Sequence, residues 1–320
     1  MNAFDGDTSP RLIGASFLLL AGIWGTAFVA IERGLHFVPP LTFAGIRYLI
    51  AGAIVLGYAA LTTDYLLPRT RRDGLKIAIY AAFFIFGNHA FLYLGEQYVS
   101  GAVAAVVVSL SPVLTAVFAS LLLADADLGL RKVLGFFSGV AGVVVIAQPS
   151  AAGLGSGTLI GVGLVFLAAA SFALGAVLAD PVPSTIPLTS LQGWSMLLGA
   201  TALVGVGSLR GETLAAITVT PTAVASLLYL SLVSGAFAFL LYFALLEEVG
   251  PADLNLVGYL EPVGATLAAW VLFGEVIDVA TVLGFVLVVA GFAMVKGRDL
   301  ADRVGVSGPA IAERTRRLIH

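Results

Sequence analysis

Long apolar runs dominate the chain, and short polar breaks separate them. A spanning helix needs about 20 mostly apolar residues. Lipid-exposed backbone must satisfy its own hydrogen bonds, which favours helices, whereas a transmembrane barrel would show short segments of alternating hydrophobicity. The pattern predicts ten transmembrane helices, over residues 12–31, 41–61, 75–95, 99–123, 131–147, 157–179, 186–209, 223–246, 251–273 and 279–295.

Basic residues are distributed unevenly over the breaks. If the N-terminus is cytoplasmic, 13 of the 16 Lys and Arg fall on the inside, Arg33 and Arg210 fall outside, and Arg47 lies within a helix. Cytoplasmic loops carry an excess of Lys and Arg, so we expect both termini in the cytoplasm. The inside residues are Arg11, Arg69, Arg71, Arg72, Lys76, Arg131, Lys132, Lys296, Arg298, Arg303, Arg314, Arg316 and Arg317.

Composition supports the same class. The chain is 59% hydrophobic and 11% charged, with a mean hydropathy of +1.04, whereas a soluble domain has about 25% charged residues. We therefore expect an all-α, multi-pass protein of the cytoplasmic membrane, with the lipid bilayer as a partner. The net charge of −3 comes without a basic stripe for nucleic acid, and the absence of cysteine excludes disulfides and thiolate metal sites.

The ends of the chain are short. The apolar run at 12–31 exceeds the roughly 7–15 residues of a signal-peptide core, so we interpret it as the first transmembrane helix. Residues 1–11 then form a cytoplasmic tail. The tail at 296–320 ends in the basic stretch ERTRRLIH, which either anchors the topology or lies on an anionic leaflet.

The two halves share motifs at nearly constant spacing. Pro-Leu-Thr occurs at 40–42 and 187–189, and the pieces VLGF and VAG occur within 133–142 and again within 282–291. Leu-Ser-Pro-Val at 110–113 matches Leu-Glu-Pro-Val at 260–263. These matches indicate a five-helix repeat at 12–147, a linker at 148–156 and a second repeat at 157–295. An odd number of helices inverts the second repeat, which is typical of alternating-access transporters, although a duplication kept only for a stable bundle is an alternative.

These motifs resemble the drug/metabolite transporter superfamily, and within it the ten-helix EamA type. The resemblance rests on WGTAFVAI (24–31), PPLTFAGIRYLIAG (39–52) and EPVGATLAAWVLFGE (261–275), and it covers nearly the whole chain. The first repeat departs from the family pattern, because Ala124-Asp125 stands where Gly-Glu is usual. The resemblance implies a transporter of small metabolites, with export as the direction, but it does not specify a substrate.

Glu261 is the most unusual residue of the apolar runs, because it lies inside the 251–273 helix directly before Pro262. An intramembrane carboxylate usually faces a cavity or a partner. Pro262 removes a backbone donor, so we expect a bend there, and the matching Pro112 suggests a second hinge. Glu261 could bind a cationic substrate group, carry a coupling proton, or be a buried structural residue. Ser111, its counterpart in the first repeat, is a weaker ligand candidate.

Arg47 is a second charge within a predicted helix. It could snorkel to the outer surface, pair with Glu32 or Glu96, or bind a substrate carboxylate. Its counterpart in the second repeat is Trp194. Further candidates for the cavity share a polar or amphipathic side chain on an otherwise apolar helix; they are Trp24, Asn88, His89, Tyr93, Gln192, Tyr242, Asn255 and Tyr259.

No catalytic constellation, cofactor motif or ATP-binding loop is present in the sequence. We therefore expect a non-enzymatic secondary transporter for a small organic metabolite, such as an amino acid derivative, a nucleoside or a drug-like compound, with protons as a candidate coupling ion. A passive channel and a membrane enzyme acting on lipid-linked substrates are the alternatives.

Overall fold

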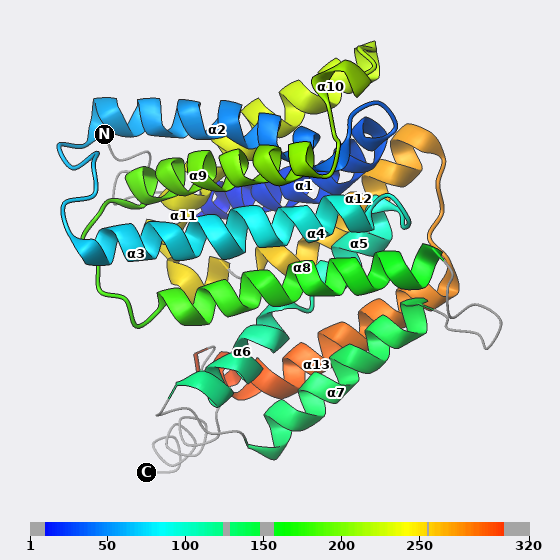
Figure 1. The fold of residues 1–320 in the computed structure, drawn as a ribbon. Helices are drawn as coiled ribbons and strands as arrows, with labels where there is room; N and C mark the ends of the chain where they lie inside the picture. Colours follow the sequence, from blue (N-terminus) through cyan, green and yellow to red (C-terminus); the bar gives the residue numbers. More distant parts are fainter. Residues whose placement is uncertain (1–9, 124–128, 148–156, 255, 304–320) are drawn as a thin grey trace, which may run out of the picture.

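The structure is a computed structural model that describes residues 10–123, 129–147, 157–254 and 256–303, and all regular elements in these ranges are helices (Figure 1). The linker at 148–156, residues 1–9 and residues 304–320 lie outside the described part. The elements are α1 (Pro10–Leu35), α2 (Pro40–Thr62), α3 (Arg71–Ile79), η1 (Tyr80–Gly87), α4 (Asn88–Gly95), α5 (Gly101–Val108), α6 (Ser111–Leu122), α7 (Leu130–Ala147), α8 (Gly157–Ala179), α9 (Leu188–Leu209), η2 (Leu214–Ala216), α10 (Pro221–Leu228), η3 (Tyr229–Phe237), α11 (Ala238–Leu254), α12 (Val257–Phe273) and α13 (Val279–Arg303).

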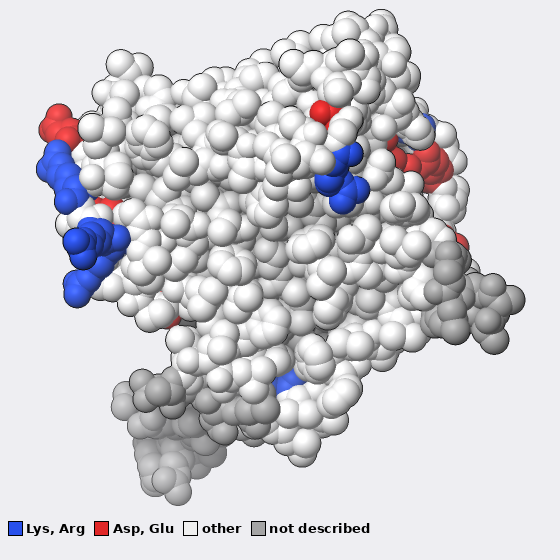
Figure 2. Space-filling view, viewed as in Figure 1, with Lys and Arg blue, Asp and Glu red and all other residues white. Residues whose placement is uncertain are grey.

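The all-helical membrane class is confirmed. Six stretches are long and apolar enough to cross a membrane, namely Arg11–Leu35, Pro40–Thr62, Arg71–Gly95, Gly101–Leu122, Gly157–Ala179 and Pro221–Val249, and shorter apolar helices cover Val257–Phe273 and Val279–Val295. Figure 2 shows a broad band almost free of charged side chains, with Lys and Arg gathered at the end of the bundle where α2 ends and α3 begins. Large apolar side chains are exposed over the surface, as expected where lipid replaces water.

Equivalent helices of the two repeats pack against each other. Along α2, Gly45 lies against Val204 of α9, while further along Gly52 lies against Met196. The residue numbers rise along one helix and fall along the other, so α2 and α9 are antiparallel. Because α2 and α9 carry the shared Pro-Leu-Thr motif, this is the arrangement that two oppositely oriented repeats produce.

The last helices of the repeats, α7 and α13, pair in the same way at the lower edge of Figure 1. A Cβ atom on Gly135 would lie 2.5 Å from the carbonyl oxygen of Gly291, and one on Gly142 would lie 2.5 Å from that of Gly284. Only glycine permits so close an approach of two helix backbones. Gly139, Gly157 and Gly161 also lie against other segments of the chain, with Leu110 next to Gly139 and Tyr98 next to the other two.

One predicted helix contains a break, and one predicted helix boundary was wrong. The 99–123 helix is interrupted at Ser109 and Leu110, just before Pro112, which occupies the first turn of α6. In the second repeat, α11 continues to Leu254, so α12 begins at Val257 rather than 251. Glu261 is therefore the fifth residue of a short helix and not the middle of a long one. Ser109 and Ser111 lie at the first break, and Asp253 and Asn255 lie at the second, but such isolated polar residues did not end the apolar runs, so apolar length alone did not locate the breaks.

Candidate functional site

A cavity of about 300 Å³ lies between the two repeats, and both contribute to its wall. Its lining comes from α1, α2, η1, α4, the α5–α6 junction, α8, α9, η3, α11 and α12, and it is mainly apolar and aromatic. Clefts of this kind, with a few polar groups among apolar walls, are typical of sites for small organic ligands.

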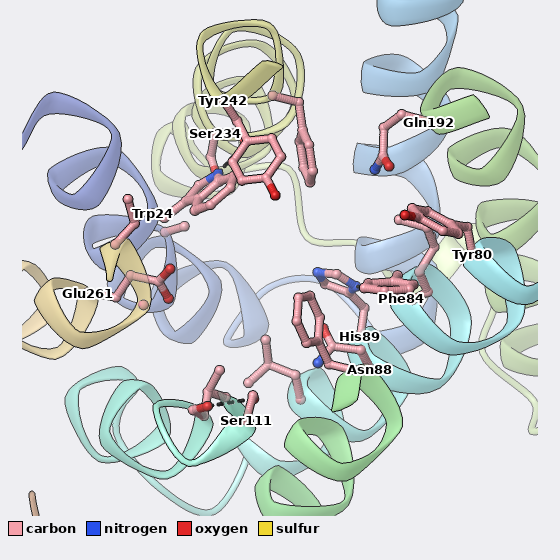
Figure 3. Close-up of a pocket in the computed structure, with 18 of the residues that line it drawn as sticks. Trp24, Tyr80, Phe84, Asn88, His89, Ser111, Gln192, Ser234, Tyr242 and Glu261 are labelled. Atoms are coloured by element: carbon pink, nitrogen blue, oxygen red, sulfur yellow. Dashed lines mark hydrogen bonds between the residues drawn. The ribbon is translucent and has the colours of Figure 1, made fainter. Parts of the chain in front are cut away.

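One wall of the cavity carries Glu261. Figure 3 shows its carboxylate beside Trp24, with Tyr242 and Ser234 on the neighbouring elements. The Trp24 indole donates a hydrogen bond to the carbonyl of Ser234 at 3.3 Å, and its ring lies 5.5 Å from the Tyr242 ring. Within the described part of the chain, no hydrogen bond or ion pair reaches the Glu261 carboxylate. The cavity thus contains an acceptor that lacks a protein counter-charge.

The Glu261 backbone is held by close helix packing. Gly25 of α1 lies so near α12 that a Cβ atom there would be 2.5 Å from the Glu261 carbonyl oxygen. Trp24 directly precedes Gly25, so the contact between α1 and α12 also brings the Trp24 indole and the Glu261 carboxylate to one wall of the cavity. The pairing of α1 with α12 across the repeats therefore sets this part of the site.

Arg47 belongs to another part of the wall. It is 4% exposed, so it does not snorkel to the surface. Its Nη1 donates to the Tyr93 hydroxyl at 3.0 Å, and its guanidinium stacks over the Tyr48 ring at 4.4 Å. Neither predicted acidic partner forms an ion pair with it, since the described residues place no carboxylate within 4.0 Å of its nitrogens.

His89 is held by hydrogen bonds at both ring nitrogens. Its Nδ1 lies 3.1 Å from the carbonyl oxygens of Phe84 and Ile85, which only accept, so this nitrogen carries a proton. Its Nε2 lies 2.6 Å from the Tyr48 hydroxyl, with which it shares a hydrogen bond. Tyr48 thereby links Arg47 to His89 in one buried polar group.

Three further predicted residues also line the cavity. The Asn88 amide donates to the Ala168 carbonyl of α8 at 2.9 Å, and the Ser111 hydroxyl donates to the Val108 carbonyl at 2.6 Å, so both also hold helices together. Gln192 reaches the wall from α9 (Figure 3). Pro112 lines the cavity as well, and its hinge role, like that of Pro262, stays a prediction.

Other predicted residues lie away from the cavity. Tyr93 is fully buried behind Arg47. The Trp194 indole donates to the Leu66 carbonyl at 3.0 Å, and Tyr259 packs on Phe292 of α13 with its ring 4.2 Å away. Asn255 lies outside the described residues. A helix presents each side chain in one direction only, and sequence alone did not determine which direction faced the cavity.

Apart from Trp24 and Tyr242, the sequence prediction missed the aromatic residues of the wall. The missed residues are Phe28, Tyr80, Phe84, Phe172, Phe239 and Phe243. In an apolar helix such residues are as typical of lipid contact as of a cavity. Because an aromatic residue looks the same in the sequence whether it faces lipid or a cavity, none of these residues indicated by itself that it lines the cavity.

Two π-helical turns occupy equivalent places in the repeats. The segment η1 spans Tyr80–Gly87 and η3 spans Tyr229–Phe237, and both contribute to the cavity wall. Such widened turns occur frequently at functional sites. A second internal match, GNHAF at 87–91 against GAFAF at 235–239, was the sequence signal that could have located them.

The cavity is not centred along the bundle. Its lining includes Leu188 and Leu191 at the start of α9 and Leu254 at the end of α11, so it extends toward the end where basic residues gather. At the opposite end, Arg33 of α1 forms an ion pair with Glu275, which follows α12, and its guanidinium lies 3.8 Å from the Phe273 ring centroid.

Comparison with known proteins gives a consistent result over the whole chain. Residues 12–148 and 159–296 each match the model of the EamA-like transporter family. An uncharacterized transporter of Archaeoglobus fulgidus is 29% identical over 87% of this chain and 96% of its own. The uncharacterized inner membrane transporter YedA of Escherichia coli K12 is 29% identical over 94% of this chain and 96% of its own.

A crystal structure with 22% sequence identity has a TM-score of 0.63 and covers 92% of this chain and 97% of its own. At that identity the likeness concerns the fold.

Proposed function

Because the chain belongs to the EamA-like transporter family, we propose that it is a secondary active transporter that exports a small organic molecule by alternating access. It is a multi-pass transporter of the cell membrane. The proposal adds a substrate site in the central cavity, ten membrane spans in two inverted repeats, and both termini in the cytoplasm.

One observation carries the substrate site, namely the Glu261 carboxylate, which faces the cavity and has no counter-charge among the described residues. A charge at membrane depth usually faces a cavity and pairs with a ligand or another residue. The faces of Trp24 and Tyr242 beside it add cation–π attraction. A positively charged amine on a flat apolar body fits this wall. Amino acid derivatives and drug-like amines have such a group, whereas nucleosides offer ring stacking only.

The state of the cavity fits alternating access. It extends toward the end with the basic loops, which the positive-inside rule assigns to the cytoplasm. The opposite end is held by the ion pair between Arg33 and Glu275, one from each repeat. We therefore interpret this conformation as inward-facing, with the outer end closed.

Counterflow in proteoliposomes tests the proposal, using labelled amino acids, nucleosides and organic cations. We expect one amine class to accumulate transiently. We also expect Glu261→Gln to lower its counterflow about tenfold or more, because a charged hydrogen bond contributes roughly 1.5–3 kcal/mol. The matched control is Glu247→Gln, an exposed carboxylate on α11, which should keep the wild-type rate.

Equal counterflow in wild type and Glu261→Gln would contradict the role of Glu261 while leaving the carrier intact. Flux that does not saturate, without exchange of substrate against itself, would instead favour a channel.

A further inference from the structure

A second, separate site lies at the end of the bundle that the ion pair closes. Here a polar pocket of about 350 Å³ forms between the end of α1 and the segment that joins α4 to α5. Its lining includes the side chains of Glu32, His36 and Glu96. It does not share a residue with the central cavity.

The two carboxylates of this pocket differ in how they are held. Glu32 accepts a hydrogen bond from the backbone N–H of Gly101 at 2.8 Å. Glu96 is 4% exposed, and neither of its carboxylate oxygens has a hydrogen-bond partner among the described residues. A buried carboxylate without a donor is strongly unfavourable as an anion, so it needs a bound cation or a proton.

A proton satisfies this environment better than a metal ion. The described part of the chain contains no group of three or more His, Asp or Glu that could hold a metal. Glu96 follows the membrane-spanning stretch that ends at Gly95. Burial raises the pKa of Glu96 well above its usual range, the negative charge of Glu32 raises it further, and the positive charge of Arg47 lowers it.

The charged and titratable groups around Glu96 connect it to the central cavity. Glu32 and His36 approach from the α1 side, Arg47 from α2 and Tyr93 from α4. The neighbouring helices α5 and α8 contain no charged residue. Arg47 lines the cavity with its guanidinium over the Tyr48 ring, and its Nη1 donates to the hydroxyl of Tyr93 at 3.0 Å. Tyr93 lies three residues before Glu96 at the end of α4, so it joins the guanidinium to the helix turn that holds Glu96.

We propose that Glu96 is a proton-binding site at the outer end of the transporter, and that its occupancy controls how Arg47 presents its charge to the substrate cavity. When Glu96 loses its proton, its carboxylate attracts the Arg47 guanidinium away from the cavity. When Glu96 takes up a proton, this attraction ends and the guanidinium is released. The link to transport rests on the proposed function, whereas the proton site itself does not. Glu261 is then left to the substrate.

Infrared titration of the purified protein in detergent tests the site without a substrate. Wild type should show protonated carboxyl bands at neutral pH, one of which is missing in Glu96→Gln but retained in Glu247→Gln and in Glu261→Gln. In Glu32→Gln the midpoint of this band should move to lower pH, because a repelling charge is gone. In Arg47→Gln it should move to higher pH, because an attracting charge is gone.

The opposite shifts of two variants keep the test decisive even if one of them does not fold. An unchanged band in Glu96→Gln would overturn the proposal, and so would loss of the wild-type band on adding sodium at constant pH, which indicates an alkali-ion site. If the band behaves as expected but no compound shows counterflow in wild type, the proton site stands and the proposed function fails. If counterflow is present, Glu96→Gln should lose the dependence of its rate on external pH.

Discussion

At the scale of single residues, the buried polar group around Arg47 is the main determinant of local chemistry. Arg47 has no carboxylate partner within ion-pair distance among the described residues, and it depends on the Tyr93 hydroxyl and the Tyr48 ring. A guanidinium placed in this way remains available to a ligand, because a strong internal ion pair does not neutralise it.

Removing the Tyr93 hydroxyl should therefore destabilise the protein. In Tyr93→Phe the buried Nη1 of Arg47 loses its acceptor, which costs about 1–3 kcal/mol. Thermal unfolding in detergent should show a midpoint several degrees below wild type. The control is Tyr58→Phe, whose side chain is 40% exposed on the same helix as Arg47 and should unfold like wild type. Equal midpoints for both variants would mean that another group accepts from Arg47.

At the scale of elements, glycine contacts position the helices that form the cavity. The crossings of α1 with α12, α2 with α9 and α7 with α13 each place a glycine against backbone or Cβ atoms of the partner. The two π-helical segments, η1 and η3, add a widened turn at equivalent places facing the cavity. Close packing and local widening together make a closed bundle with room for a ligand.

The substitution Gly142→Ala tests this packing. Its new Cβ atom would lie 2.5 Å from the Gly284 carbonyl oxygen, so α7 and α13 must separate. Overpacking of this kind costs roughly 1–3 kcal/mol, and we expect a lower unfolding midpoint. Gly163→Ala on α8 is the matched control, because no atom lies within 4 Å of the added Cβ atom. If the Gly142→Ala protein is as stable as the control, α7 and α13 can separate at little cost in stability, and the prediction is wrong.

At the scale of the whole molecule, the two repeats meet around the cavity and close it at one end. The ion pair between Arg33 and Glu275 joins α1 of the first repeat to the end of α12 in the second. In an alternating-access cycle such a contact must break when the outer end opens. The chain has no cysteine, so single cysteines can report which end is open.

Breaking this ion pair should make the cavity more accessible from outside. A cysteine at Ser234 should react with an impermeant maleimide faster when Glu275→Gln is also present. A partly exposed ion pair contributes up to about 1 kcal/mol, or roughly a fivefold shift in population. The charge-swapped double variant, Arg33→Glu with Glu275→Arg, should restore the slow labelling of the cysteine at position 234.

Two exposed positions calibrate this labelling and test the proposed topology. Arg210→Cys should react in intact cells, and Arg72→Cys should react only after permeabilisation. The reverse pattern would overturn the proposed orientation. Unchanged labelling at Ser234 in the Glu275→Gln background would show that the ion pair does not hold the outer end.

By itself, the sequence determined the class of the protein. Apolar runs of membrane length predicted helices over all ten ranges, and in the described residues helices cover most of each range, apart from the breaks at Ser109 and before Val257. The family followed from the matching motifs. The eight predicted residues found at the cavity are Trp24, Arg47, Asn88, His89, Ser111, Gln192, Tyr242 and Glu261. Polar residues in apolar helices are conspicuous in a sequence, because burying them is costly and they are rare unless they have a role.

The tertiary structure alone decided which side chains face the cavity and where the helices break. Trp194 and Tyr259 point elsewhere, and the aromatic lining came from residues with no polar signal. The interruption at Ser109 and the late start of α12 lie at isolated polar residues that did not end the apolar runs. The physical reason is common to all of these. Lipid and a neighbouring helix are equally apolar environments, so the direction of an apolar side chain is determined only by the helices that pack around it.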